Sequence, residues 1–88
     1  GSGGLDLVFS GNKSILLEVK EGATLGDVVT LLGNEHAKDK KEMFWVGGKV
    51  RPGILVLVND VDWELLEKDN TKLEDKDIIC FISTLHGG

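Results

Sequence analysis

The residues best suited to chemistry are the last two, Gly87 and Gly88, and the chemistry they suit is acyl activation. Two glycines place no Cβ atom beside the terminal carboxylate, so the backbone can enter a channel too narrow for a side chain. The carboxylate is ionised at neutral pH, because the pKa of a terminal carboxyl group is about 3.3–3.7. It can attack the α-phosphate of ATP, and adenylation then gives the acyl carbon a good leaving group. We therefore expect Gly88 to be a reactive terminus.

The other side chains with reactive groups lack the neighbours that an active site requires. His36 and His86 do not stand in a metal-ligand spacing such as His-x-x-x-His. Cys80 lies inside an apolar run, where a free cysteine is expected to pack as a small buried hydrophobe. Asp60 and Asp62 lack the further ligands of a calcium loop, so we expect them at a turn and a strand start. No catalytic residue and no metal site are expected, and we predict that the chain is not an enzyme.

Three further features have ordinary structural interpretations. Trp45 and Trp63 are expected in the core, as aromatic residues of a small domain usually are. The pair Gly47-Gly48 is not followed by a helix pattern, so it does not indicate a phosphate loop. The acidic stretch 64–77 is interpreted either as a solvated face or as a docking surface for a basic partner, and the sequence does not decide between them.

Length and charge restrict the class of protein. A chain of 88 residues makes one domain and is too short for two. Its 15 acidic and 10 basic residues give a net charge of −5, which disfavours direct binding to nucleic acid or to an anionic membrane. The longest apolar run, residues 53–58, is far too short to span a bilayer. The single cysteine excludes an intramolecular disulfide framework.

One helix is predicted in the first half of the chain. Thr24 can cap it, and Asp27 three residues later completes a box-like capping pattern. Gly33 stands where a left-handed C-cap would end it. The apolar residues that follow the cap recur at helical spacing and form one stripe, which must lie on a sheet: Leu25, Val28, Val29 and Leu32.

The remaining apolar segments alternate or run continuously, as strands do. Residues 5–9 and 15–19 predict a hairpin around the turn residues 10–13. Later strands are predicted at 54–58, covered on both faces, at 61–66, and at 78–82 in the sheet interior, with Leu73 as an apolar anchor between the last two. One helix packed over a mixed sheet is an α+β two-layer domain.

The domain boundaries follow from this order of elements. Residues 1–4 lack a starting Met and are interpreted as a cloning scar or flexible N-terminus. Residues 5–82 form the folded domain. Residues 83–88 are expected to be a flexible C-terminal tail, whose six residues reach at most ~20 Å when extended.

Two segments of the second half resemble a known family. Residues 51–66, RPGILVLVNDVDWELL, and residues 81–88, FISTLHGG, resemble the signature of the eukaryotic ubiquitin-related modifiers. The resemblance implies an α+β β-grasp (ubiquitin-like) fold with one main helix across a mixed sheet. It also implies a dual function as protein modifier and sulfur carrier. Residues 33–48 depart most from the family pattern.

The resemblance assigns roles to the tail residues. Gly88 would carry the acyl group, and it would be the point of thiocarboxylation and of the isopeptide crosslink. Gly87 would give clearance in the enzyme's channel. Thr84, Leu85 and His86 would form the extended tail read by the activating enzyme, with His86 standing where ubiquitin has an arginine and acting either as a discriminator or as a spacer. No cofactor is expected on the chain, since the ATP is used by the activating enzyme.

The implied partners are an E1-like activating enzyme with a sulfurtransferase domain, a tRNA thiolase complex and lysines of target proteins. The sulfur would serve 2-thiolation of wobble uridine in tRNA, and the carrier would be a cytoplasmic monomer, with the nucleus as a second compartment. Two alternatives stay open. One is a prokaryotic-type sulfur carrier for thiamine or molybdopterin synthesis, and the other is a non-covalent ubiquitin-like interaction module.

Overall fold

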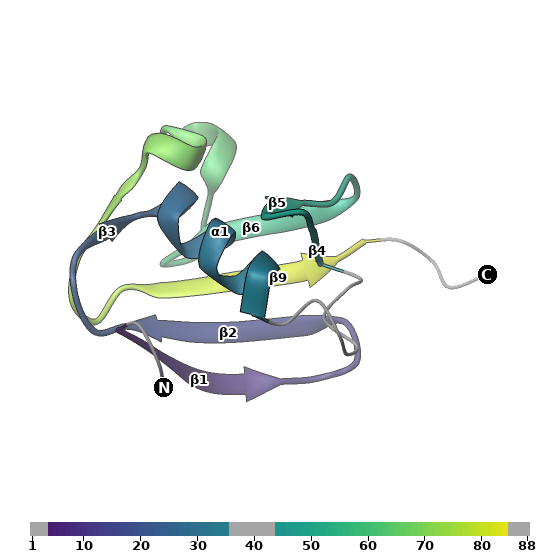
Figure 1. Cartoon of the computed structure of the whole chain (residues 1–88), viewed down its shortest axis with the longest axis horizontal. Helices are drawn as coiled ribbons and strands as arrows, with labels where there is room; N and C mark the ends of the chain where they lie inside the picture. Colours follow the sequence, from purple (N-terminus) through teal and green to yellow (C-terminus); the bar gives the residue numbers. More distant parts are fainter. Residues whose placement is uncertain (1–3, 36–43, 85–88) are drawn as a thin grey trace.

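The computed structural model describes residues 4–35 and 44–84, and its main feature is a five-stranded sheet in the order β1-β2-β9-β6-β7. Helix α1 (Leu25–Glu35) lies across one face of this sheet (Figure 1). This arrangement confirms the predicted α+β architecture with one main helix. The five strands are β1 (Leu5–Ser10), β2 (Ser14–Val19), β6 (Ile54–Val58), β7 (Val61–Asp62) and β9 (Ile78–Ser83).

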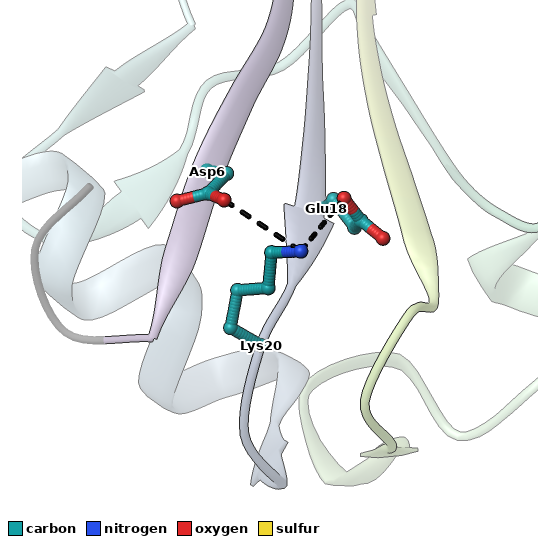
Figure 2. Close-up of polar contacts among 3 residues, drawn as sticks. All are labelled: Asp6, Glu18 and Lys20. Carbon is teal, nitrogen blue, oxygen red and sulfur yellow. Dashed lines mark ion pairs between the residues drawn. The ribbon is translucent and has the colours of Figure 1, made fainter.

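The predicted N-terminal hairpin is confirmed as β1 paired with β2. Two carboxylates face each other in this hairpin, and a lysine lies beside both of them. Asp6 stands directly opposite Glu18, a like-charge pair that disfavours the hairpin. The ammonium group of Lys20 lies 3.7 Å from Asp6 Oδ2 and 3.2 Å from Glu18 Oε1 (Figure 2). Its hydrogen bond to Glu18 and the charges of both carboxylates raise the pKa of Lys20. One exposed cation thus offsets the repulsion between the two carboxylates.

The start of the helix is as predicted, and its end is not. The Thr24 amide donates to Asp27 Oδ2 at 3.3 Å and the Asp27 amide donates to Thr24 Oγ1 at 3.2 Å, which is a capping box. The apolar stripe is buried on the sheet. The helix does not end at Gly33 but continues to Glu35. A glycine inside a helix costs only about 1 kcal/mol relative to alanine, so it does not by itself end a helix.

The core lies between the helix and the sheet face beneath it. Trp45 and Phe81 are the largest fully buried side chains, and their ring centroids are 5.1 Å apart in an edge-on arrangement. Leu73 is buried as predicted. The prediction that strand 54–58 is covered on both faces is wrong, because Leu55 and Leu57 are half-buried on the face turned away from the helix.

The directions of the strands differ from the predicted mixed sheet. Every strand pair of the described residues is antiparallel, since β2 rather than β1 lies beside the central strand β9. Burial explains this order. Three side chains of β2 are buried under the helix, whereas β1 buries only Leu5 and occupies the edge.

Two short strand pairs and two turns of 3₁₀ helix were not predicted. β3 (Ala23–Thr24) pairs with β8 (Lys72–Leu73), and β4 (Trp45–Val46) pairs with β5 (Lys49–Val50). Gly47 and Gly48 join the second pair with φ angles of 59° and 75°, as a two-residue hairpin turn requires.

The strand predicted at 61–66 is also shorter than expected. β7 ends at Asp62, whose carboxylate accepts the Glu64 amide at 2.9 Å and starts the 3₁₀ turn η2 (Trp63–Leu65). A second 3₁₀ turn, η3 (Lys68–Asn70), follows. No helix of the described residues has the length and apolar character needed to cross a membrane.

Candidate functional site

The candidate site is the end of β9, where the chain leaves the body toward the terminal glycines. β9 is the central strand, and it is hydrogen bonded to β2 on one side and to β6 on the other. At its end the Ser83 amide donates to the carbonyl oxygen of Lys13 at 2.8 Å. The Thr84 amide and hydroxyl both donate to the carbonyl oxygen of Gly53, at 2.9 and 2.6 Å. The last two described residues are therefore fixed to two separate loops, Ser83 to one and Thr84 to the other.

These bonds move the predicted boundary of the tail. Ser83 belongs to β9 and is buried, although the domain was predicted to end at residue 82. Thr84 is exposed but is bonded to Gly53. The other predicted tail residues, Leu85, His86, Gly87 and Gly88, lie outside the described residues. Four residues of the sequence follow Thr84, and four residues reach at most about 14 Å when extended.

Gly53 and Lys13 are site residues that the sequence did not indicate. Residues 51–53 contain a proline and a glycine, so the sequence predicts a turn there, and Gly53 has a φ of 88°. The turn does not reveal which residue its carbonyl oxygen meets, because Thr84 is 31 positions later. Both contacts use backbone carbonyl oxygens, which every residue carries. The register of β6 against β9, with Ile54 opposite Ser83, brings Gly53 to the tail, and the register of β2 against β9, with Ser14 opposite Ile82, brings Lys13 there.

We call Ser83 and Thr84, which hold the tail to the body, the tail root. The substitution Thr84→Val is expected to loosen the tail root without unfolding the domain. It keeps the size and branching of the side chain and removes the hydroxyl bond to Gly53. A net loss of about 1 kcal/mol in local stability corresponds to about fivefold faster amide exchange at positions 83 and 84. Hydrogen exchange followed by NMR measures this. Thr84→Ser retains the hydroxyl and should exchange at the wild-type rate, and equal rates for all three proteins would contradict a role for the hydroxyl.

The remaining reactive side chains do not converge on a site in the described part of the chain. Asp62 caps η2, and Asp60 occupies the turn after β6 with a φ of 68°. Trp45 is buried and Trp63 packs against the core. His36 lies outside the described residues. Within residues 4–35 and 44–84, no group of three or more His, Cys, Asp or Glu side chains is placed to hold a metal ion.

Cys80 was predicted to be buried, but it is half-buried. It lies on the outer face of the sheet, which is the face turned away from the helix. Burial, and secondarily the negative charge of Asp60, raise the pKa of its thiol. The native state therefore holds the thiol proton more tightly than the unfolded chain. This contribution to stability is present below the pKa of the unfolded thiol and is lost as the pH rises through the folded pKa.

Alkylation of Cys80 is consequently expected to be slow at neutral pH, because the thiolate is the reacting form. The rate of reaction with iodoacetamide should rise with a midpoint above that of an unstructured cysteine peptide. Asp60→Asn removes the charge and suits the left-handed backbone, so it should move the midpoint down. A midpoint at or below the peptide's value would show that the thiol is not shielded.

A cavity of about 500 Å³ opens on the helix side of the molecule, away from the tail root. Its lining includes Thr24, Asp27, Lys49, Trp63 and Asp69. None of the residues at the end of β9 lines it. The cavity is therefore not part of the candidate site.

Comparison with known proteins points to one family. A family model described as Urm1 (Ubiquitin related modifier) matches residues 2–88. The ubiquitin-related modifier 1 of Schizosaccharomyces pombe is 48% identical over 89 residues, which cover 98% of this chain and 92% of that protein. The ubiquitin-related modifier 1 homolog 2 of Arabidopsis thaliana is 52% identical over 73 residues, covering 83% and 74%. The Gallus gallus ubiquitin-related modifier 1 is 44% identical over 89 residues, covering 98% and 88%.

Proposed function

Because the chain belongs to the ubiquitin-related modifier (Urm1) family, we propose that it is a modifier and sulfur carrier that acts through the carboxylate of Gly88. The family and the helix packed across the sheet confirm the predicted ubiquitin-like β-grasp fold. In this role the chain is the substrate of an activating enzyme and not itself a catalyst.

The proposed chemistry begins with activation of the terminus. The Gly88 carboxylate attacks the α-phosphorus of ATP on an E1-like enzyme, and pyrophosphate leaves. The sulfur of a persulfide on the enzyme's sulfurtransferase domain then replaces AMP at the acyl carbon. A thiol cleaves the sulfur–sulfur bond and becomes part of a disulfide, which leaves a thiocarboxylate on Gly88. Each step takes place on atoms that a side chain at position 87 would crowd.

The observation that carries the proposal is the fixed tail root next to a Gly-Gly end. Hydrogen bonds from Ser83 and Thr84 to two loops set the point at which the chain leaves the body. From that point Leu85 to Gly88 reach at most about 14 Å, enough to pass from a docked body into a neighbouring active site. A fixed root limits the orientations that the enzyme must select, which lowers the entropic cost of productive binding.

The downstream partners follow from the activated group. We propose that a tRNA thiolase complex takes the sulfur for 2-thiolation of wobble uridine, and that target lysines attack the activated acyl carbon to form isopeptide bonds. The net charge of −5 suits a cytoplasmic carrier that hands sulfur over without touching tRNA itself.

The direct test is the intact mass of the protein after incubation with an E1-like activating enzyme, ATP and a sulfur donor. The expected result is the mass gain of one oxygen-for-sulfur exchange, dependent on ATP. An unchanged mass with an enzyme that is active on another member of the family would contradict the carrier role and favour a non-covalent interaction module.

A further inference from the structure

The negative charge of this protein is concentrated in one short segment. Residues 60–69 contain five acidic residues and one lysine, so they hold four of the five net negative charges of the chain. The single lysine, Lys68, lies 3.8 Å from the carboxylate of Glu64. In the described part of the chain, the carboxylates of Glu67 and Asp69 make no ion pair or hydrogen bond. The segment thus carries a large excess of negative charge within ten residues.

The same segment exposes leucine side chains. Leu65 is 79% exposed, the largest value among the bulky apolar residues of the described chain, and Leu66 is 38% exposed. The geometry of η2 explains this, because Trp63 packs against the core while Leu65 ends the turn on the outside. A leucine that is 79% exposed contributes little to the stability of the fold, since the hydrophobic contribution requires removal of the side chain from water.

The exposure does not result from a loose backbone. The Leu66 amide donates to the carbonyl oxygen of Trp63 at 3.0 Å, and the Glu67 amide donates to Thr71 Oγ1 at 3.0 Å. η3 also lies tightly on the helix, because a Cβ on Gly26 would stand 3.0 Å from the carbonyl oxygen of Asp69. The backbone that carries the leucines and the carboxylates is therefore held in a fixed arrangement.

We propose that the surface formed by Asp62 to Asp69 docks a basic protein segment, one that presents an apolar side chain between lysine or arginine residues. The apolar contact with Leu65 and Leu66 would supply affinity, since it removes those side chains from water. The acidic residues of the same segment would supply charge complementarity, which accelerates association and rejects acidic partners. We name this surface the acidic–leucine surface.

The acidic–leucine surface lies at the opposite end of the sheet from the tail root. β7, which leads into it, pairs with Leu57 and Val58, whereas Ile54 at the other end of β6 pairs with Ser83. Figure 1 shows the segment after β6 on the far side of the molecule from the C-terminal end of β9. A partner bound here leaves the tail root accessible, so the inference does not depend on the proposed sulfur chemistry.

The test is an NMR titration of the full chain with a synthetic peptide of three Lys-Leu-Arg repeats. Amide shifts are expected to cluster at residues 60–70, and added salt should weaken binding. Leu65→Ser, and Glu67→Gln combined with Asp69→Asn, should each weaken binding by about fivefold or more. Deletion of residues 85–88 should leave binding unchanged, which separates this result from any failure of the proposed function.

Matched controls distinguish the surface from general charge or general stickiness. Val46→Ser changes an apolar side chain that is 56% exposed elsewhere, and Glu21→Gln combined with Glu74→Gln removes the same charge from exposed sites outside the segment. Both should bind the peptide as the wild type does. The proposal is overturned by the absence of saturable binding, by shifts centred outside residues 60–70, by equal binding of a peptide with serine in place of leucine, or by control variants that weaken binding equally.

Discussion

Deletion of Gly88 is expected to abolish ATP-dependent activation of this protein and to leave its thermal unfolding midpoint unchanged. The shortened chain still ends in a carboxylate on glycine, but the reacting atoms stand one residue, about 3.5 Å, short of the position that they reach in the full chain. A displacement of about 1 Å at a reacting centre already costs about a hundredfold in rate. Pyrophosphate exchange catalysed by the activating enzyme, together with calorimetric unfolding, measures both quantities.

The unfolding midpoint is the internal control of that experiment. In the described part of the chain, the last hydrogen bond from the C-terminal end to the body is made by Thr84, four residues before Gly88. Removing Gly88 therefore deletes no described contact. Gly87→Ala keeps the chain length and adds one Cβ, so it should slow activation through crowding and leave the midpoint unchanged. Turnover of the Gly88-deleted protein at the wild-type rate would place the chemistry elsewhere on the molecule.

The elements that the sequence predicted correctly are those whose signals are local. The hairpin of β1 and β2 follows from alternation, and the cap of α1 follows from Thr24 and Asp27 three positions apart. The apolar stripe of the helix and the strand β9 follow from spacing and from a continuous apolar run. These patterns are set by bonds between near neighbours, or by burial of one face, so one sequence is enough to read them.

The features that the sequence did not predict depend on distant partners. β3 and β8 have two residues each and exist because each pairs with the other across about half the chain. The helix passes through Gly33 although glycine is a local stop signal, since a glycine inside a helix costs only about 1 kcal/mol. The choice of β2 as the neighbour of β9 depends on how many side chains each hairpin strand can bury.

The candidate site shows the same division. The proposal that the reactive group is at the terminus rests on the residue type of the terminal glycines alone, because their useful property is the absence of a side chain. The bonds that fix Ser83 and Thr84 end on carbonyl oxygens of Lys13 and Gly53, and residue type does not mark a carbonyl oxygen as a partner. Residue types alone were therefore enough to propose a reacting atom, whereas the place where the tail leaves the body was not predictable from the sequence.

The second large effect is expected from Phe81→Ala, which should lower the free energy of unfolding by about 3–5 kcal/mol. Phe81 is fully buried in the central strand, between Ile15 of β2 and Val56 of β6, and its ring meets that of Trp45 edge-on at 5.1 Å. Truncation of a buried phenylalanine to alanine costs about 3–5 kcal/mol, because transfer energy is lost and a cavity remains. A domain of this length has a free energy of unfolding of roughly 4–13 kcal/mol.

Urea unfolding followed by tryptophan fluorescence measures the loss, and Leu65→Ala is the matched control. Leu65 is 79% exposed, so its truncation should change the free energy of unfolding by less than about 0.5 kcal/mol. The tail root depends on the same strand, since the Ser83 and Thr84 bonds exist only while β9 lies between its neighbours. Phe81→Ala should therefore also raise the KM of activation, whereas Gly88 deletion acts without loss of fold. A loss below about 1 kcal/mol for Phe81→Ala would mean that the Phe81–Trp45 contact is not the centre of the core.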